Sequence, residues 1–298
     1  MVQLLSTLTL LLLLPMLGLA ATKEQALRDV YASIHQTNPK SQYPFHIISS
    51  EDGDLLSANI FMLLQVPYAE FRTQLQSPRN WCEFLILHLN IKSCVESERK
   101  ADSYLTLYVG RKVYQPPEIT YQLEYRFRLL ENRDAFFESI MSAETGPMRT
   151  RDYRIRVQAS PYEGKTLLRL GMQYRRSFFS KSATFTYLKT LGRNKIGFTI
   201  TGEDEQGLPI YVDGVKAVIE RNVMRYFLAV NVYLEQDANT DFQTRLNHWF
   251  DATQKYHEQL YEYDRETYIE SKLKEYTNQQ GLQREEDVKR MLRPQRSG

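Results

Sequence analysis

The chain has 298 residues, and its 38 Lys and Arg against 36 Asp and Glu give a formal net charge of +2. This balance argues against a nucleic-acid-binding protein, because such proteins carry a basic excess on one face. Hydrophobic residues make up 42% and charged residues 25%, so disorder of the whole chain is excluded. Two cysteines are too few for a disulfide-dense scaffold or a four-cysteine zinc site.

The first twenty residues are uncharged and mostly apolar, with an uninterrupted leucine run at 10–14. Gly18 and Ala20 place small residues at the −3 and −1 positions of a signal-peptidase site, and the apolar stretch is short for a membrane span. We therefore predict a secretory signal peptide over residues 1–20 and a periplasmic location for a mature chain that starts near Ala21. An uncleaved anchor is the alternative.

Residues 21–50 are predicted to form an N-terminal segment with one short helix at 23–35. Alternating apolar residues then predict a strand over 56–66. Helical spacing predicts a short helix over 68–75, and Ser77-Pro78 predicts the start of a second one that runs through Phe84.

Cys82 and Cys94 follow, and in an exported chain they are free to pair. One continuous helix would hold their Cα atoms about 18 Å apart, so a disulfide requires the chain to turn between them. The period-two alternation of residues 87–92 makes such a turn into a strand plausible. We predict a Cys82–Cys94 disulfide; the alternative is two separately buried thiols.

The middle of the chain is predicted to be sheet. Strands are expected at residues 104–109, 119–129, 135–141, 153–159 and 166–178. The strand at 119–129 alternates fully, with apolar side chains on one face and polar or charged ones on the other. Short connections between successive strands imply an antiparallel, meandering sheet with one long apolar face.

The remainder is predicted to be mainly helical, with a short helix at 182–191 and a hairpin around 203–207. Asp213 then N-caps a long helix that runs to about Glu235 and is apolar on both sides, so it needs a cover on each. We expect the sheet to cover one side and a helix over 242–263 to cover the other. A further helix over 265–280 is expected to end at Gly281, before a polar tail at 282–298.

The predicted elements follow the order strand, two short helices, antiparallel strands and one long helix. This order resembles the helix-grip fold of the START-related superfamily, which includes lipid-transfer domains and polyketide cyclases. The resemblance covers roughly residues 51–236. Its most characteristic segment, residues 214–230, is similar to the closing helix of uncharacterised secreted START-like proteins of Gram-negative bacteria. The predicted fold class is thus α+β: a curved antiparallel sheet grips a long C-terminal helix, and residues 237–281 add a helical extension packed on this domain.

The resemblance implies a tunnel between sheet and helix that holds an apolar or amphipathic small molecule. Asn222 is expected in the centre of the apolar stripe of the long helix, where a buried amide must be hydrogen-bonded, either to the sheet or to a ligand. Tyrosine rings around it suit an amphipathic guest. The predicted ligand-binding set is Tyr121, Leu123, Tyr125, Phe127, Leu170, Met172, Tyr174, Asn222 and Tyr226.

The sequence contains no metalloprotease helix motif, nucleophile elbow, P-loop or paired Cys-x-x-Cys, and its five histidines have no metal-binding spacing. We therefore expect no catalytic residues, cofactor or metal. The leading hypothesis is a monomeric periplasmic carrier of a hydrophobic or lipid-like molecule, with transient membrane contact and no nucleic-acid partner. A cyclase- or hydrolase-like enzyme on the same fold and a non-catalytic structural factor of the envelope stay open, since fold analogy does not choose among them.

Overall fold

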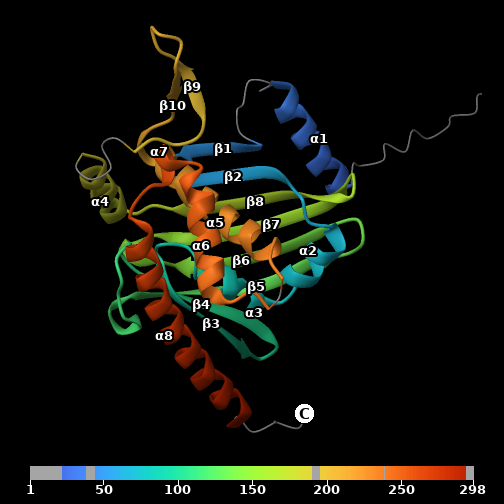
Figure 1. The fold of residues 1–298 in the computed structure, drawn as a ribbon, viewed down its shortest axis with the longest axis vertical. Helices are drawn as coiled ribbons and strands as arrows, with labels where there is room; N and C mark the ends of the chain where they lie inside the picture. The colour runs from blue at the N-terminus through green and yellow to red at the C-terminus, as the bar shows by residue number, and fades with distance from the viewer. Residues whose placement is uncertain (1–21, 38–43, 190–194, 238, 293–298) are drawn as a thin grey trace, which may run out of the picture.

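A computed structural model describes residues 22–37, 44–189, 195–237 and 239–292, so the predicted signal peptide lies outside the described residues. Its centre is an eight-stranded antiparallel sheet with the strand order β1-β2-β8-β7-β6-β5-β4-β3 (Figure 1). The strands are β1 (Phe45–Asp52), β2 (Leu55–Leu64), β3 (Ile91–Arg99), β4 (Asp102–Val109), β5 (Tyr121–Asn132), β6 (Phe137–Thr145), β7 (Arg151–Tyr162) and β8 (Lys165–Arg175). From β3 to β8 each strand pairs with the next in the chain, which is the predicted meander.

The sheet has an inner face covered by α5 (Gly214–Leu234) and an outer face partly covered by α1 (Lys23–Thr37). Helix α5 packs on β1, β2 and β8, and on its other side it packs against α6 (Phe242–Gln254) (Figure 1). The short helices α2 (Tyr68–Leu75) and α3 (Pro78–Leu85) lie between sheet strands in sequence, and α3 also packs on α5. This is the helix-grip fold. The predicted fold class is confirmed.

The C-terminal helix α8 (Arg265–Leu292) lies along β3, the edge strand of the sheet (Figure 1). The predicted end of this helix at Gly281 is wrong: the helix continues to Leu292, so residues 282–292 are not a tail. Tertiary contacts override the weak helix propensity of the glycine. Gln283 hydrogen-bonds both the backbone N–H and the C=O of Glu96, at 2.8 and 3.0 Å.

The helix predicted over 242–263 is broken into α6 and α7 (His257–Leu260). The break occurs at Tyr256, whose backbone leaves the helical region (φ −123°, ψ 47°). Its ring packs edge-on against Phe45 and Phe198, at centroid distances of 5.5 and 5.7 Å. These contacts with distant parts of the chain, which the local helical pattern does not encode, account for the break.

Strand β1 was not predicted: it begins in the segment 21–50, for which only a short helix was expected, and continues to Asp52. Only its first two residues, Phe45 and His46, are buried, whereas residues 47–52 are partly or fully exposed. Such a polar end is typical of an edge strand. The remaining elements are α4 (Phe178–Lys189), the hairpin β9 (Ile200–Glu203) and β10 (Pro209–Tyr211), and the short helices η1 (Pro117–Ile119) and η2 (Pro147–Arg149).

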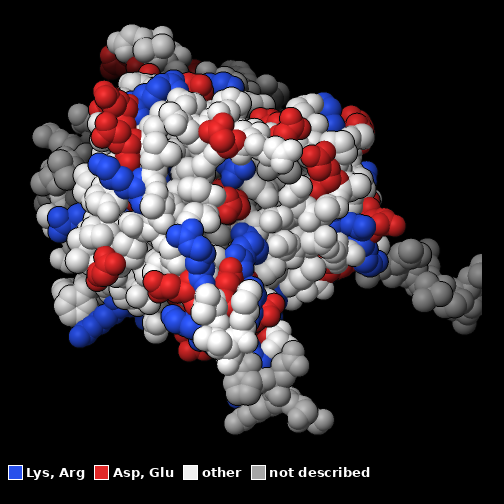
Figure 2. Space-filling model, turned by 60° about the horizontal axis from the view of Figure 1, so that its bottom comes forward, with Lys and Arg blue, Asp and Glu red and all other residues white. Residues whose placement is uncertain are grey.

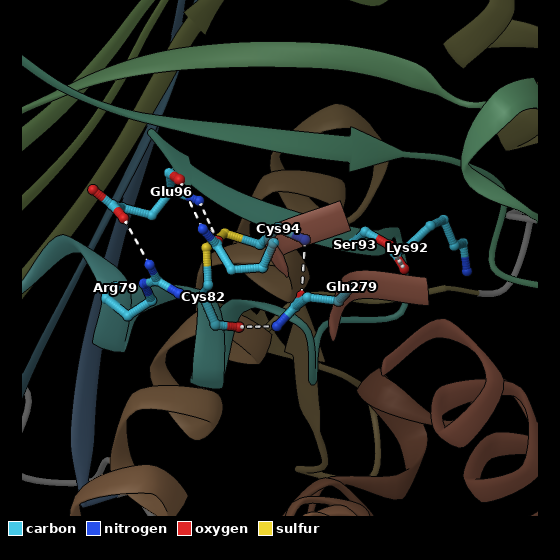
Figure 3. The surroundings of a disulfide bond; sticks show 8 residues. Arg79, Cys82, Lys92, Ser93, Cys94, Glu96 and Gln279 are labelled. Atoms are coloured by element: carbon cyan, nitrogen blue, oxygen red, sulfur yellow. Dashed lines mark hydrogen bonds and ion pairs between the residues drawn. A yellow bond between two sulfur atoms is a disulfide. The ribbon is translucent and has the colours of Figure 1, made fainter. Parts of the chain in front are cut away.

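The disulfide between Cys82 and Cys94 is present and joins α3 to β3, with 5.1 Å between the Cα atoms (Figure 3). The chain turns between the two residues, as predicted, although β3 begins only at Ile91. Gln279 of α8 binds the backbone of both cysteines: its Oε1 accepts from Cys94 N at 2.8 Å, and its Nε2 donates to Cys82 O at 3.4 Å. The disulfide therefore lies in the contact between the sheet edge and α8.

Acidic and basic side chains alternate over the face shown in Figure 2, and neither sign forms an extended area there. In the part of the chain that the structure describes, no helix is both long and apolar enough to cross a membrane.

Candidate functional site

The predicted apolar set forms the wall of the inner face. Leu123, Tyr125, Phe127, Leu170 and Met172 are each at most 9% exposed. Together with Tyr174 and Tyr226 they belong to one hydrophobic cluster that joins β5, β8 and α5. The structure thus brings seven of the nine predicted residues into contact with the same core.

A cluster of tyrosines occupies this wall, and Tyr153 of β7 is its central member. The Tyr153 ring stacks on Tyr174 with centroids 5.1 Å apart and meets Tyr125 edge-on at 6.3 Å. Sequence reasoning did not include Tyr153, although its alternation with Ile155 and Val157 on β7 placed it on the apolar face. Burial raises the pKa of the hydroxyls of Tyr125, Tyr153 and Tyr174, so all three stay protonated at neutral pH.

The hydroxyls of this cluster differ in their hydrogen bonding. Tyr153 Oη lies 2.6 Å from Thr150 Oγ1. Among the described residues, the hydroxyls of Tyr125 and Tyr226 have no hydrogen-bond partner. Neither oxygen is fully shielded from solvent. Both oxygens are therefore not completely enclosed by protein atoms, although Tyr125 is 2% and Tyr226 8% exposed. This is the position predicted for a ligand, between sheet and long helix.

His88, which sequence reasoning missed, borders the tyrosine cluster. Its ring stacks on Tyr226 with centroids 4.4 Å apart. Its Nδ1 accepts a hydrogen bond from Asn90 N at 3.1 Å, so the proton of the neutral ring is assigned to Nε2. Burial, followed by the charge of Arg225, lowers the pKa of His88 and keeps the ring neutral. Nε2 is buried and has no acceptor in the described part of the chain.

A group of cations lies next to His88. Arg225 Nη2 donates to the Glu262 carboxylate at 2.8 Å, and the same carboxylate pairs with Lys112 and, at 3.7 Å, with Lys195. Arg221, 2% exposed, lies one turn before Arg225 on α5 and donates to a backbone carbonyl. Burial, and then repulsion by Arg225, lowers the pKa of Lys112 to about 8. The Glu262 carboxylate thus holds three of these cations together beside His88.

The other two predicted residues lie at the margin. Tyr121 is 39% exposed at the start of β5, and Asn222 is half-buried one turn before Tyr226. The expected hydrogen bond from Asn222 to a sheet residue is absent among the described residues, because α5 places this amide toward the rim of the core instead of its centre. The site that the structure assembles is therefore centred on Tyr125 and Tyr226.

Glu220 of α5 lies in the interior of the protein at 0% exposure. Its carboxylate accepts four hydrogen bonds: from Ser49 Oγ at 2.6 Å, Thr199 Oγ1 at 2.8 Å, and the backbone N–H groups of Phe198 and Thr199 at 2.7 and 3.0 Å. These bonds tie β1 and the approach to the β9–β10 hairpin to α5. Glu220 thus holds the grip helix in place and is not part of the ligand wall.

A separate hollow of about 550 Å3 lies on the other side of α5, between this helix, α6 and β2. None of the nine predicted residues lines it. Within residues 22–37, 44–189, 195–237 and 239–292, no group of His, Cys, Asp or Glu has an arrangement suited to a metal ion.

No protein-family model and no curated protein matches the chain. Its structure is similar to solved helix-grip proteins, all of them distant. Ara h 8.0201 is 9% identical with a TM-score of 0.34, over 65% of this chain and 99% of that one. Norcoclaurine synthase from Thalictrum flavum is 10% identical (TM-score 0.30, 48% and 81% covered), and human STARD10 is 7% identical (TM-score 0.30, 58% and 76% covered). Likenesses this distant carry no inference about ligand or activity.

Proposed function

We propose that this protein binds and carries an amphipathic small molecule between the inner face of the sheet and α5. The apolar part of the molecule lies against Leu170, Met172 and the tyrosine rings. Its polar group accepts hydrogen bonds from the hydroxyls of Tyr125 and Tyr226. The role needs no catalytic group.

The observation that carries this proposal is the pair of tyrosine hydroxyls on an apolar wall that have no hydrogen-bond partner among the described residues. A buried polar group without a partner costs about 1–3 kcal/mol, so a well-packed structural core avoids it. A ligand pocket, by contrast, is mostly apolar with a few polar groups that orient the guest.

Met172→Trp tests the proposal, because the larger side chain should take the place of the ligand beside the tyrosine cluster. We expect loss of binding of the fluorescent dye 1-anilinonaphthalene-8-sulfonate, which is apolar and anionic, with little change in the free energy of unfolding. Met224→Trp is the matched control: Met224 is 0% exposed on α5, and overpacking there should cost about 1–3 kcal/mol.

A large loss of stability in Met172→Trp, together with no dye binding by the unaltered protein, would mean that this wall is a solid core. Native mass spectrometry of protein from its own host gives an independent measurement. A co-purifying apolar mass that Met172→Trp loses supports a carrier.

The proposed location is the periplasm. Two observations support it: the uncharged, apolar residues 1–20 with small residues at 18 and 20, and a disulfide of the kind that persists in oxidising compartments. The intact mass of the native protein, with and without reductant and alkylation, tests both points. Retained residues 1–20 or two free thiols would contradict this placement.

A further inference from the structure

A hollow of about 230 Å3 lies on the outer face of the sheet, across β2, β8 and β7. It is lined by three arginines, Arg154 and Arg156 from β7 and Arg169 from β8, together with Ser57, Asn59, Gly171, Met172 and Gln173. Apart from Met172, which belongs to the inner core, these residues alternate with those of the inner face, so the three arginines and the tyrosine cluster lie on opposite sides of the sheet.

Gly171 accounts for the space. It lies opposite Asn59 on one neighbouring strand and opposite Arg156 on the other. A Cβ atom at this position would lie 2.6 Å from Asn59 Oδ1. Any larger residue would therefore displace Asn59 and occupy the centre of the hollow.

Hydrogen bonds within the site leave donors for a ligand. Arg169 Nε donates to Asn59 Oδ1 at 3.0 Å, which leaves the Nδ2 donor of that amide unused. Arg169 Nη1 donates to Gln158 Oε1 at 3.1 Å, and Arg156 Nη1 to Glu138 Oε1 at 2.6 Å. Because each guanidinium carries five N–H donors, most of the donors of these two arginines remain for a ligand.

The charges of the site are not balanced. Glu138, 1% exposed, is the carboxylate that pairs with Arg156, and it also pairs with Lys23 at 2.6 Å. Arg154 has no ion pair within the described ranges. Burial, and then the charge of Arg156, lowers the pKa of Arg169. Three guanidinium groups therefore share one carboxylate, and at least two positive charges remain to be neutralised.

We propose that this hollow binds the phosphate group of a small phosphorylated molecule. A phosphomonoester carries close to two negative charges at neutral pH and three acceptor oxygens, which matches the excess charge and the surrounding donors. Planar guanidinium groups bind such oxygens in pairs, and Arg is the side chain best suited to this geometry. The site does not depend on the function proposed above.

Isothermal titration calorimetry of the full chain with sodium phosphate and pyrophosphate, at constant ionic strength in chloride, tests the site. We expect binding that weakens about tenfold in Arg154→Gln and in Arg169→Gln, as for the loss of one charge-assisted contact. Arg128→Gln is the matched control, because Arg128 is exposed on β5 of the same face and does not line the hollow. Gly171→Ala should also weaken binding while it keeps all three arginines.

Melting curves in chloride show whether each variant folds, so a loss of binding is separated from a loss of structure. A folded Arg154→Gln that binds phosphate as well as Arg128→Gln does, or an unaltered protein that does not distinguish phosphate from chloride, would overturn the proposal. Binding to phosphatidylcholine vesicles with and without phosphatidate shows whether the phosphate group belongs to a lipid or to a soluble molecule. Arginine-dependent retention on phosphatidate indicates a lipid headgroup, and phosphate binding without retention indicates a soluble ligand.

Discussion

Replacement of Gln279 and Gln283 by Ala tests how the edge of the sheet is closed. The side-chain amides of these two residues form hydrogen bonds with the backbone of the edge strand β3, as a ninth strand would. They accept from the backbone N–H groups of Cys94 and Glu96, each at 2.8 Å, and they donate to Cys82 O at 3.4 Å and to Glu96 O at 3.0 Å (Figure 3). Cys94 is 0% and Glu96 4% exposed, so water does not replace these bonds while α8 stays in place.

The magnitude follows from the two orphaned N–H groups, since each buried donor left without a partner costs about 1–3 kcal/mol. The better helix propensity of Ala returns a few tenths of a kcal/mol for each substitution, roughly. We therefore expect Gln279→Ala/Gln283→Ala to lower the free energy of unfolding by about 2–5 kcal/mol. Urea denaturation with the disulfide intact measures it.

Gln280→Ala is the matched control, because Gln280 lies on the same helix without a hydrogen bond to β3 among the described residues, and we expect a change within about 0.5 kcal/mol. Since the double variant also uncovers a sheet edge, it should form oligomers at high concentration. A double variant as stable and as monomeric as Gln280→Ala would refute the assigned role of α8.

Two further predictions concern the C-terminal helices. Trp249, 2% exposed, stacks on Tyr268 at 5.0 Å; Trp249→Ala should cost about 3–5 kcal/mol in equilibrium unfolding, and a loss below about 1 kcal/mol would show that α6 is not integral to the domain. Burial lowers the pKa of Lys272 from 10.5 to about 8, so between these values the unfolded chain binds more protons. The free energy of unfolding should then rise by about 2–3 kcal/mol from pH 8 to pH 10 through this group. Melting curves of Lys272→Met should lack this part of the rise. If the variant kept the pH dependence of the unaltered protein, the assignment to Lys272 would be wrong.

The parts of the fold that sequence could predict are those whose pattern is local. Period-two alternation in β5 marks its inner face directly, and the apolar stripe of α5 marks the grip helix. The break at Tyr256 and the continuation of α8 through Gly281 depend on contacts with β1 and β3, and no local pattern carries that information.

The same distinction applies to the site. Tyr125 and Tyr226 were predictable because each lies on a periodic apolar face. His88 was not, because it lies in the turn between α3 and β3 and meets Tyr226 only after the sheet has closed on α5. The three arginines of the outer hollow follow the same period-two pattern as polar residues on any solvent-exposed strand face. Only the strand register around Gly171 brings them together around one hollow.

The two unpartnered hydroxyls predict a trade-off between stability and binding. If the two hydroxyls stabilised the folded protein, the double variant Tyr125→Phe/Tyr226→Phe would be less stable than the unaltered protein. Neither hydroxyl, however, has a hydrogen-bond partner to lose among the described residues. Removal of an unpaired polar group from an apolar wall is neutral or stabilising, so the ligand-free double variant should melt at or above the temperature of the unaltered protein. Tyr153→Phe is the control, because its hydroxyl is bonded to Thr150 and its loss should cost about 1 kcal/mol. The double variant should at the same time bind the anionic dye more weakly, since the ligand's polar group loses its donors. A double variant that is less stable than Tyr153→Phe and binds the dye as well as before would show that these hydroxyls support the core and that the ligand, if any, lies elsewhere.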